Sequence, residues 1–511
     1  MDSEGTIVAL ARDKIDAEII ALKERIRALR TERNRLAPIS RCPPEVLAEI
    51  FVWFQQTYLG KLYTSRDFPS NYRKWVVVTH VSQHWRQIAL SFKSLWNVIP
   101  VRWLGYATES LNRLGPMPML VVGNETRWGV DYTPLWESIA TECHRIRFLR
   151  GVVGSSVANF NQPMPFLEHV EITSKCDLSP SVISPSLRTL VLSGCDFTWN
   201  WPALPHLTTL EIFDPANRIS FDRFVDILQN SPDLKRLAIK NIFRAPTTSS
   251  PKDFKPSQPS LLLPQLRYFR SGRSQFSLDL LSQLRFTDRF SIDIHAGEIS
   301  AGSVPRAMQV FNRILLGSSM TIRVLHLISE YGPRFTLALR ERPTYTSTCI
   351  DFSFDPPTQG EIPGSYAKHL TILPLDEVDE LMTNVMRGST MWKDSGFGQL
   401  PNLRNINVQD TGHTFLEHIT KDYEEFKESR NHGTLSFSSL QEVKMGKLQF
   451  GRELKYPVCA ALAGREKAGY RFKKLVISSG QVSEDSAKQL QKYVDRVEVP
   501  APAKTQGRRR R

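Results

Sequence analysis

The chain of 511 residues has few cysteines and no long apolar run. Six cysteines are too few and too widely spaced for a disulfide framework, which favours a reducing compartment, cytoplasmic or nuclear. They are Cys42, Cys143, Cys176, Cys195, Cys349 and Cys459. No stretch approaches the roughly 20 apolar residues that a membrane helix needs. Charged residues interrupt positions 1–37, so we expect neither a secretory leader nor a membrane partner.

Motifs that carry catalysis are also missing. The sequence has no CxxC pair, no GxSxG turn and no HExxH motif. His80 and His84 are four residues apart, but no third metal ligand follows nearby. Gly464 and Gly469 have the spacing of a phosphate loop, but Tyr470-Arg471 follows where Lys-Ser or Lys-Thr is required. We therefore expect no enzyme activity, no catalytic residue, no metal and no cofactor.

Positive charge is in excess but thinly spread. Sixty-six Lys and Arg against 52 Asp and Glu give a formal net charge of +14. Lys504 and the run 508–511 form a basic tail, which is either a nuclear-import signal or only a solvated, disordered segment. Elsewhere basic residues alternate with acidic ones, so nucleic acid is a less favoured partner than protein.

The first periodic segment covers residues 8–36. Apolar residues recur at alternating steps of four and three, as in the seam of a coiled coil. The seam comprises Ile15, Ile19, Leu22, Ile26, Leu29 and Leu36, with Arg33 interrupting it. Over 1–37 we expect an amphipathic, coiled-coil-like helix that lies on the next domain; dimerisation or docking is the alternative.

Two further helical patterns follow within residues 38–100. Pro43 and Pro44 open the first, because proline is tolerated in the first turn of a helix. Its apolar face carries Val46, Leu47, Ile50, Phe51 and Phe54. Residues 60–74 are expected to form a polar loop. The second helix then carries an apolar stripe made of Val78, Val81, Trp85, Ile88 and Ala89.

These residues resemble an F-box. The resemblance lies in Ile-Ser at 39–40, Pro-Pro-Glu-Val-Leu at 43–47, Ile-Phe at 50–51, Val-x-x-x-Trp-Arg-x-Ile-Ala at 81–89 and Leu-Trp at 95–96. With the heptad helix before them, they are similar to the F-box-like proteins abundant in mushroom-forming fungi. Ser82 stands where the second helix of that family usually has Cys.

The resemblance implies that this unit binds a Skp-family adaptor and, through it, a cullin. The residues expected to shape the unit are Pro43, Pro44, Glu45, Leu47, Ile50, Phe51, Val81, Trp85 and Ile88. Some of them must form the core of the unit and others its binding face, and the sequence does not separate the two groups.

A short sequence motif, called the leucine phrase below, recurs through residues 144–498. A proline or turn precedes Leu-x-x-Leu-x-Leu, in close copies that begin at 165, 185, 205, 232 and 264 and in looser copies at 321, 401, 438 and 471. Steps of about 20–29 residues are the signature of a leucine-rich-repeat solenoid. The spacing is irregular between 275 and 400, and residues 245–260 are a Pro/Ser/Thr-rich loop insertion.

The expected architecture is an α+β multidomain protein, in which a small helical F-box-like domain is followed by an α/β leucine-rich-repeat solenoid. A linking segment over 101–143 reads as a helix, a Gly-Pro turn and a strand, and residues 499–511 read as a basic disordered tail.

One face of the repeats is a candidate target-binding surface. In Leu-x-x-Leu-x-Leu the leucines point into the core, so the residues between them point outward together. That face would carry Glu171, Glu211, Arg236, Lys240, Tyr268 and Arg270, acidic or neutral in the early repeats and basic in the later ones. The alternative is that these are only solvated strand residues.

The resemblance therefore implies a substrate-receptor subunit of an SCF-type cullin ubiquitin ligase, which binds the adaptor by its F-box and an unknown target protein by its repeats. A repeat scaffold with no ligase role is one alternative. A nucleic-acid or chromatin binder is another, less favoured one.

Overall fold

The structure is a computed structural model, and it divides the chain into two compact units. Unit 1 comprises Met1–Leu187 with Cys195–Phe197, and unit 2 comprises Arg188–Gly194 with Thr198–Arg511. The residues that the structure describes are 2–59, 72–123, 130–151, 160, 162–173, 175–178, 180–244, 261, 263–272, 276–286, 290–298, 303–318, 320–329, 334–341, 349–355, 363–386, 388–429, 435–446, 448–449, 452–482 and 484–499. The predicted loop insertion over 245–260 and the basic run 508–511 lie outside them.

Unit 1 begins with helices. They are α1 (Asp2–Arg35), η1 (Pro38–Arg41), α2 (Pro44–Leu59), η2 (Tyr72–His80), α3 (Gln83–Ser91) and η3 (Lys93–Trp96). The prediction of one continuous helix through Val78 and Ala89 is wrong, because Ser82 adopts an extended conformation and caps α3. Its Oγ accepts a hydrogen bond from the Trp85 backbone N at 3.1 Å. His80 and His84 therefore belong to different elements.

Parallel strands complete unit 1. They are β1 (Val98–Pro100), β2 (Met119–Val122), β3 (Ile146–Gly151) and β4 (His169–Thr173), each paired with the next. The intervening helical elements are α4 (Leu104–Leu114), α5 (Thr133–Thr141), η4 (Cys143–Arg145) and, after β4, η6 (Pro180–Val182). The predicted order of helix, turn and strand before residue 123 is confirmed, with Gly115 at φ 57° in the turn. Strand pairing thus starts well before residue 144.

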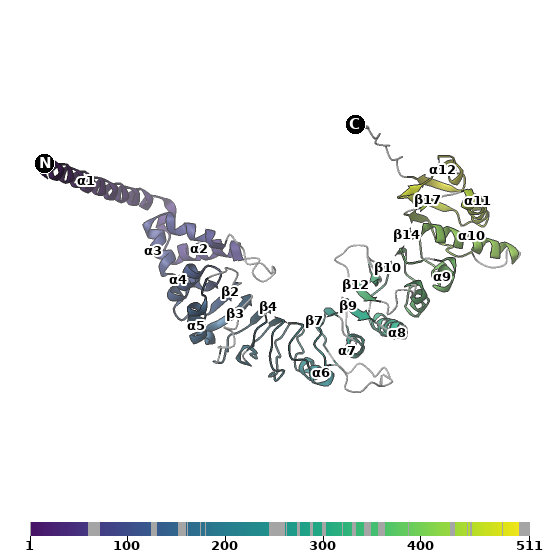
Figure 1. Cartoon of the computed structure of the whole chain (residues 1–511), viewed down its shortest axis with the longest axis horizontal. Coiled ribbons are helices and arrows are strands. Elements are labelled where there is room, and N and C mark those ends of the chain that lie inside the picture. Colours follow the sequence, from purple (N-terminus) through teal and green to yellow (C-terminus); the bar gives the residue numbers. More distant parts are fainter. Residues whose placement is uncertain are drawn as a thin grey trace. The chain divides into compact units, whose positions relative to one another are not determined.

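Unit 2 opens with five parallel strands in sequence order. They are β5 (Thr189–Ser193), β6 (Thr209–Phe213), β7 (Arg236–Lys240), β8 (Tyr268–Gly272) and β9 (Ser291–Glu298). Their register aligns one buried column: Leu190, Leu210, Leu237, Phe269 and Ile292. Helices α6 (Phe221–Gln229) and α7 (Ser277–Gln283) lie on one side of these strands (Figure 1). The leucine phrase therefore marks a strand whose leucines stack on those of its neighbours.

The irregular region contains the one antiparallel strand found in the described part of unit 2. After α8 (Ser303–Leu316) come β10 (Val324–Ser329), β11 (Phe335–Arg340) and β12 (Cys349–Asp355). Strand β12 pairs parallel with β9, β11 runs antiparallel between β12 and β10, and β10 pairs parallel with β13. Only a few residues join β10 to β11, and a short connection permits antiparallel pairing whereas parallel pairing needs a longer crossover.

The C-terminal part returns to parallel pairing. Strands β13 (Glu380–Thr383), β14 (Asn405–Val408), β15 (Glu442–Met445), β17 (Phe472–Ile477) and β19 (Val494–Glu498) pair in that order. A separate parallel pair joins β16 (Leu448–Gln449) to β18 (Gly480–Gln481). The helical elements here are η7 (Pro363–Ile372), α9 (Ser389–Asp394), η8 (Phe397–Gln399), α10 (Gly412–Glu428), α11 (Arg452–Lys467) and α12 (Glu484–Leu490). Gly464 lies inside α11 and so in no phosphate loop.

Each of the nine leucine phrases contains a strand of the structure, and the mixed α and β composition is confirmed. Among the helices that the structure describes, none combines the length and the hydropathy needed to cross a membrane. Cys42, Cys143, Cys176, Cys195 and Cys459 form no disulfide.

Candidate protein-docking surfaces

The predicted F-box residues separate into a core group and an exposed group. Leu47 and Phe51 of α2 are 0% and 1% exposed, and Ile88 of α3 is also buried. Trp85 is half-buried, and its ring packs 5.0 Å from that of Phe51. These four side chains therefore hold α2 and α3 together, and the buried Leu47, Phe51 and Ile88 cannot meet a partner without unfolding the unit.

The remaining predicted residues lie on the surface. Pro43, Pro44 and Glu45 are exposed at the start of α2, where Pro44 is the first helical residue and Glu45 lies in the first turn. A carboxylate in the first turn interacts favourably with the helix dipole. Ile50 and Val81 are exposed apolar side chains.

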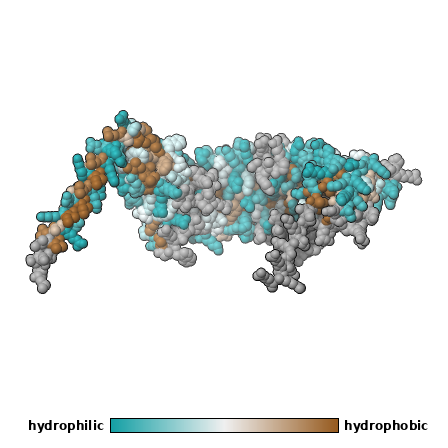
Figure 2. All heavy atoms as spheres, turned by 90° about the horizontal axis from the view of Figure 1, so that it is seen from above, coloured by the Kyte–Doolittle hydropathy of each residue, from teal (hydrophilic) through white to brown (hydrophobic). Residues whose placement is uncertain are grey.

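Three more exposed apolar residues accompany Ile50 and Val81. Val46 and Trp53 flank Ile50 on α2 at steps of four and three. Val77 lies on η2, and Val81 lies in the turn that follows η2. We call Val46, Ile50, Trp53, Val77 and Val81 the exposed apolar set. Figure 2 shows hydrophobic surface gathered over the part of unit 1 that follows α1. Val46, Trp53 and Val77 were not among the predicted site residues, although the helical step from Ile50 to Trp53 was readable in the sequence.

A buried polar network fixes the elements that carry this set. The Gln55 side-chain amide donates to the Tyr72 hydroxyl at 2.8 Å and to the Leu95 carbonyl at 2.7 Å. Trp75 Nε1 donates to the Tyr106 hydroxyl at 3.0 Å. Burial raises the pKa of Tyr106 to about 12 and the pKa of Tyr72 well above its ordinary value. Both phenols therefore stay neutral at physiological pH, and the network ties α2 to η2 and η2 to α4.

The core under the exposed apolar set continues into the first strands. Val98 of β1, Val122 of β2 and Phe148 of β3 belong to the same buried cluster as Leu47 and Phe51. The helical segment thus shares its core with the strands that follow it.

Helix α1 presents a second apolar surface. Its seam residues Ile15, Ile19, Leu22, Ile26 and Leu29, with Val8 before them and Leu36 just after the helix, are all between 41% and 72% exposed. The seam is not used for packing on the following domain, contrary to the interpretation that we favoured from the sequence.

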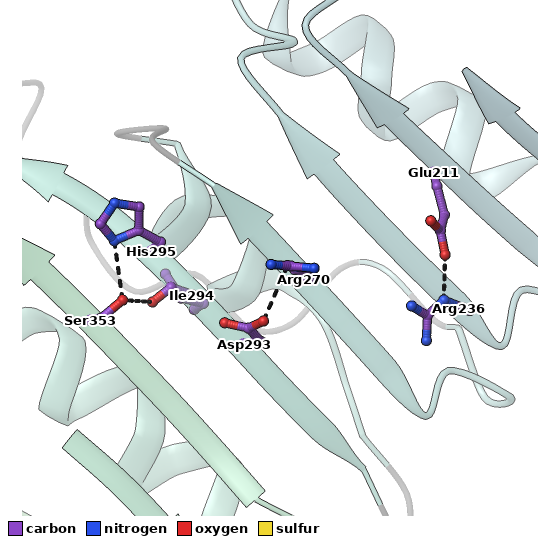
Figure 3. A network of polar contacts seen from close by, with 7 residues as sticks. All are labelled: Glu211, Arg236, Arg270, Asp293, Ile294, His295 and Ser353. Carbon is purple, nitrogen blue, oxygen red and sulfur yellow. Dashed lines mark hydrogen bonds and ion pairs between the residues drawn. The ribbon is translucent and has the colours of Figure 1, made fainter. Parts of the chain in front are cut away.

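The strand face of unit 2 carries a different, polar surface (Figure 3). Arg236 of β7 donates to the carboxylate of Glu211 on β6, which is buried. The guanidinium of Arg236 also lies 3.7 Å from the ring centroid of Tyr268 on β8. Lys240 contacts Asp214 at 2.8 Å.

The polar row continues across β8, β9 and β12. Arg270 Nε lies 3.1 Å from Asp293, whose register partner on β12 is Asp351. Burial raises the pKa of Asp293; the Asp351 charge raises it further and the Arg270 charge opposes the shift. His295 Nδ1 lies 3.1 Å from the hydroxyl of Ser353 (Figure 3).

Of the predicted target-binding residues, the structure brings Glu211, Arg236 and Tyr268 into contact, and the others pair with residues that were not predicted. Arg236, Lys240 and Arg270 each contact a carboxylate, so the expected basic half of the face is charge-compensated. Glu171 lies on β4 in unit 1, where Arg150 contacts it at 3.0 Å. Within the described ranges, no group of three or more His, Cys, Asp or Glu side chains could hold a metal ion.

No family model matches the chain, and no curated protein matches its sequence.

Proposed function

We propose that the protein is a substrate-receptor subunit of an SCF-type cullin ubiquitin ligase. In this proposal residues 38–100 are an F-box-like domain that binds a Skp-family adaptor, and through it a cullin. The parallel strands that follow are a leucine-rich-repeat solenoid that binds the target protein. The observation that carries the proposal is the exposed apolar set on α2, η2 and the turn after η2.

Exposed apolar side chains of this size are costly to leave in water. Ile50 is 43% and Trp53 is 70% exposed, although both stand on a helix whose other face is fully buried. Burying one such side chain against a partner is worth about 1.5–3 kcal/mol. Val46, Ile50 and Trp53 follow the spacing by which a helix presents one face to a hydrophobic groove or to another helix. The arrangement suits a helical adaptor.

The proposed role of the repeats is supported by the register of unit 2. Leucines from successive phrases share one buried column, so each unit buries its apolar edge only against its neighbours, as in a repeat solenoid. The opposite strand face is wide and polar. Its basic residues are paired with carboxylates, which suits a protein target better than a polyanion.

Adaptor binding is tested with the full chain co-expressed with a Skp-family adaptor. The double variant Ile50→Asp/Trp53→Asp places two charges in the exposed apolar set and leaves Leu47 and Phe51 in the core. We expect it to lose adaptor co-purification while keeping its circular dichroism spectrum. Asn112→Asp is the control, because Asn112 is exposed on α4, outside the proposed F-box-like segment 38–100.

Three results would contradict the proposal: no adaptor binding by the wild-type chain, equal losses in Asn112→Asp and the double variant, or adaptor binding that persists in a folded double variant. Binding of other proteins without any adaptor would instead favour a repeat scaffold.

A further inference from the structure

We propose that α1 pairs with α1 of a second copy of this chain, as an antiparallel two-stranded coiled coil in one defined register. The exposed seam from Val8 to Leu36 is long enough for this, and Figure 2 shows the hydrophobic stripe of α1 flanked by hydrophilic surface. This inference is independent of adaptor binding, because it uses none of the exposed apolar set.

The heptad positions of the seam follow from its steps of four and three. Ile19 and Ile26 take position a, and Ile15, Leu22 and Leu29 take position d. Isoleucine at a with leucine at d is typical of two-stranded rather than larger coiled coils. A second copy of α1 therefore suits this seam. Whether the two helices run parallel or antiparallel depends on their charged residues.

A parallel pair is disfavoured by like charges. In a parallel dimer each a residue faces the same residue of the other copy, so Arg12 would face Arg12 and Arg33 would face Arg33. The flanking g and e positions would also set Arg25 against Arg30 of the second copy. Only Glu18 with Lys23 would be favourable.

An antiparallel pair removes these conflicts in the register that sets Ile19 against Leu22 of the second copy. Position a then packs against position d, so Ile26 meets Ile15. Arg12 and Arg33 lie beside the apolar Leu29 and Val8, respectively, instead of beside another arginine. Each arginine can lay its aliphatic stem on the seam and keep its charge in water.

The flanking charges match in the same register. Glu18 lies against Arg25 of the second copy, and Asp16 lies against Lys23. Each pair occurs twice by symmetry, and all four side chains are exposed on α1 and available. Shifting the register by one heptad, so that Ile19 faces Leu29, would set Arg25 against Arg25 and Lys23 against Lys23. Charge complementarity therefore selects a single register.

The two chains leave such a dimer at opposite ends. The overlap of residues 8–33 is about 39 Å long at 1.5 Å per residue. The segments that begin at Pro38 are therefore separated by the whole coiled coil, so the exposed apolar set of each copy stays accessible.

The test is sedimentation velocity on the full chain with the single reversal Arg25→Glu. In the proposed register this variant sets two carboxylates against each other at both ends, so we expect the dimer dissociation constant to rise about tenfold. In a parallel dimer the same variant would relieve the Arg25–Arg30 repulsion, and the dissociation constant would fall. Adding Glu18→Arg restores attraction in the antiparallel register and should return the dissociation constant to the wild-type value.

Arg27→Glu is the matched control, with the same change of charge on α1 but off the seam and its flanks; it should leave the dissociation constant unchanged. Ile19→Asp should give a monomer with an unchanged circular dichroism spectrum. A wild-type chain that is monomeric at about 100 µM would overturn the proposal. So would tighter dimerisation of Arg25→Glu, or a dimer that survives Ile19→Asp.

Discussion

Ile50 and Phe51 are neighbours in α2 and face opposite environments: Phe51 is sealed in the core against Trp85, and Ile50 is exposed. Both are large apolar residues in the middle of one helix. Phe51 therefore belongs to the core that stabilises the helical segment, and Ile50 belongs to the surface that is available to a partner.

Truncating the two residues should therefore have unequal effects on stability. Phe51→Ala leaves a cavity between α2 and α3 and should lower the free energy of unfolding by about 3–5 kcal/mol. Ile50→Ala removes an exposed side chain and should change it by less than about 0.5 kcal/mol. Hydrogen exchange of residues 44–96 measures this locally. Equal loss of protection in both variants would show that Ile50 is also part of the core.

The cap of α3 provides a second prediction. Ser82→Ala removes the oxygen that accepts from the Trp85 backbone N, and should cost about 1 kcal/mol. Ser82→Cys should cost a similar amount, because sulfur is a weak acceptor. Ser82→Asp should retain stability. Thermal unfolding of the three variants checks the order; a stable Ser82→Ala variant would contradict the capping role.

The ion pair of β6 and β7 should be the strongest on the polar strand face. Arg236→Glu leaves the buried Glu211 without its cation and opposes it with a like charge, so we expect a loss of about 2 kcal/mol. Arg270→Glu, whose partner Asp293 is more exposed, should cost less than about 1 kcal/mol. Urea unfolding measures both.

A double-mutant cycle isolates the Arg236–Glu211 interaction. Glu211→Arg combined with Arg236→Glu should recover part of the lost stability, though not the contact of Arg236 with the ring of Tyr268. No recovery at all would mean that the cost of Arg236→Glu comes from the ring contact instead.

Asp293 should make unit 2 less stable as the pH rises. Burial raises its pKa above 3.8, so the folded state binds the proton more tightly than the unfolded chain does. The favourable contribution is complete below 3.8 and is lost as the pH rises through the raised pKa of the folded state. Asp293→Asn removes this titration, so its stability relative to wild type should increase across that window and then stay constant. Urea unfolding at a series of pH values tests this; a constant difference from acidic to neutral pH would contradict it.

The strands of the repeats were predictable because the leucine phrase specifies both the strand and its buried side. Leu190, Leu210 and Leu237 occupy equivalent places in their phrases, and the observed register aligns them. The position of β11 was not predictable, since its antiparallel pairing depends on which distant strands flank it. No local feature of residues 335–340 shows that β12 will join β9.

The presence of helices in residues 38–100 was predicted from the sequence. Which of their apolar residues are exposed was not predicted. Leu47 and Ile50 are both aliphatic and share a helix face in the sequence pattern, so only the packing of α2 on η2 and α3 decides which is buried. Ser82 interrupts the apolar period with a residue that favours caps, and this was a readable signal for two elements rather than one.

The position of β12 has a consequence for synthesis on the ribosome. From β5 to β8, each strand gains its second neighbour from the next strand to emerge. Strand β9 does not, because β10 pairs with β11 and β13 instead. Its free edge stays open until Asp355 has left the exit tunnel, and an open edge is a template for intermolecular pairing. The nascent chain thus passes through an interval of exposed strand edge that ends only when β12, the third strand made after β9, pairs with β9.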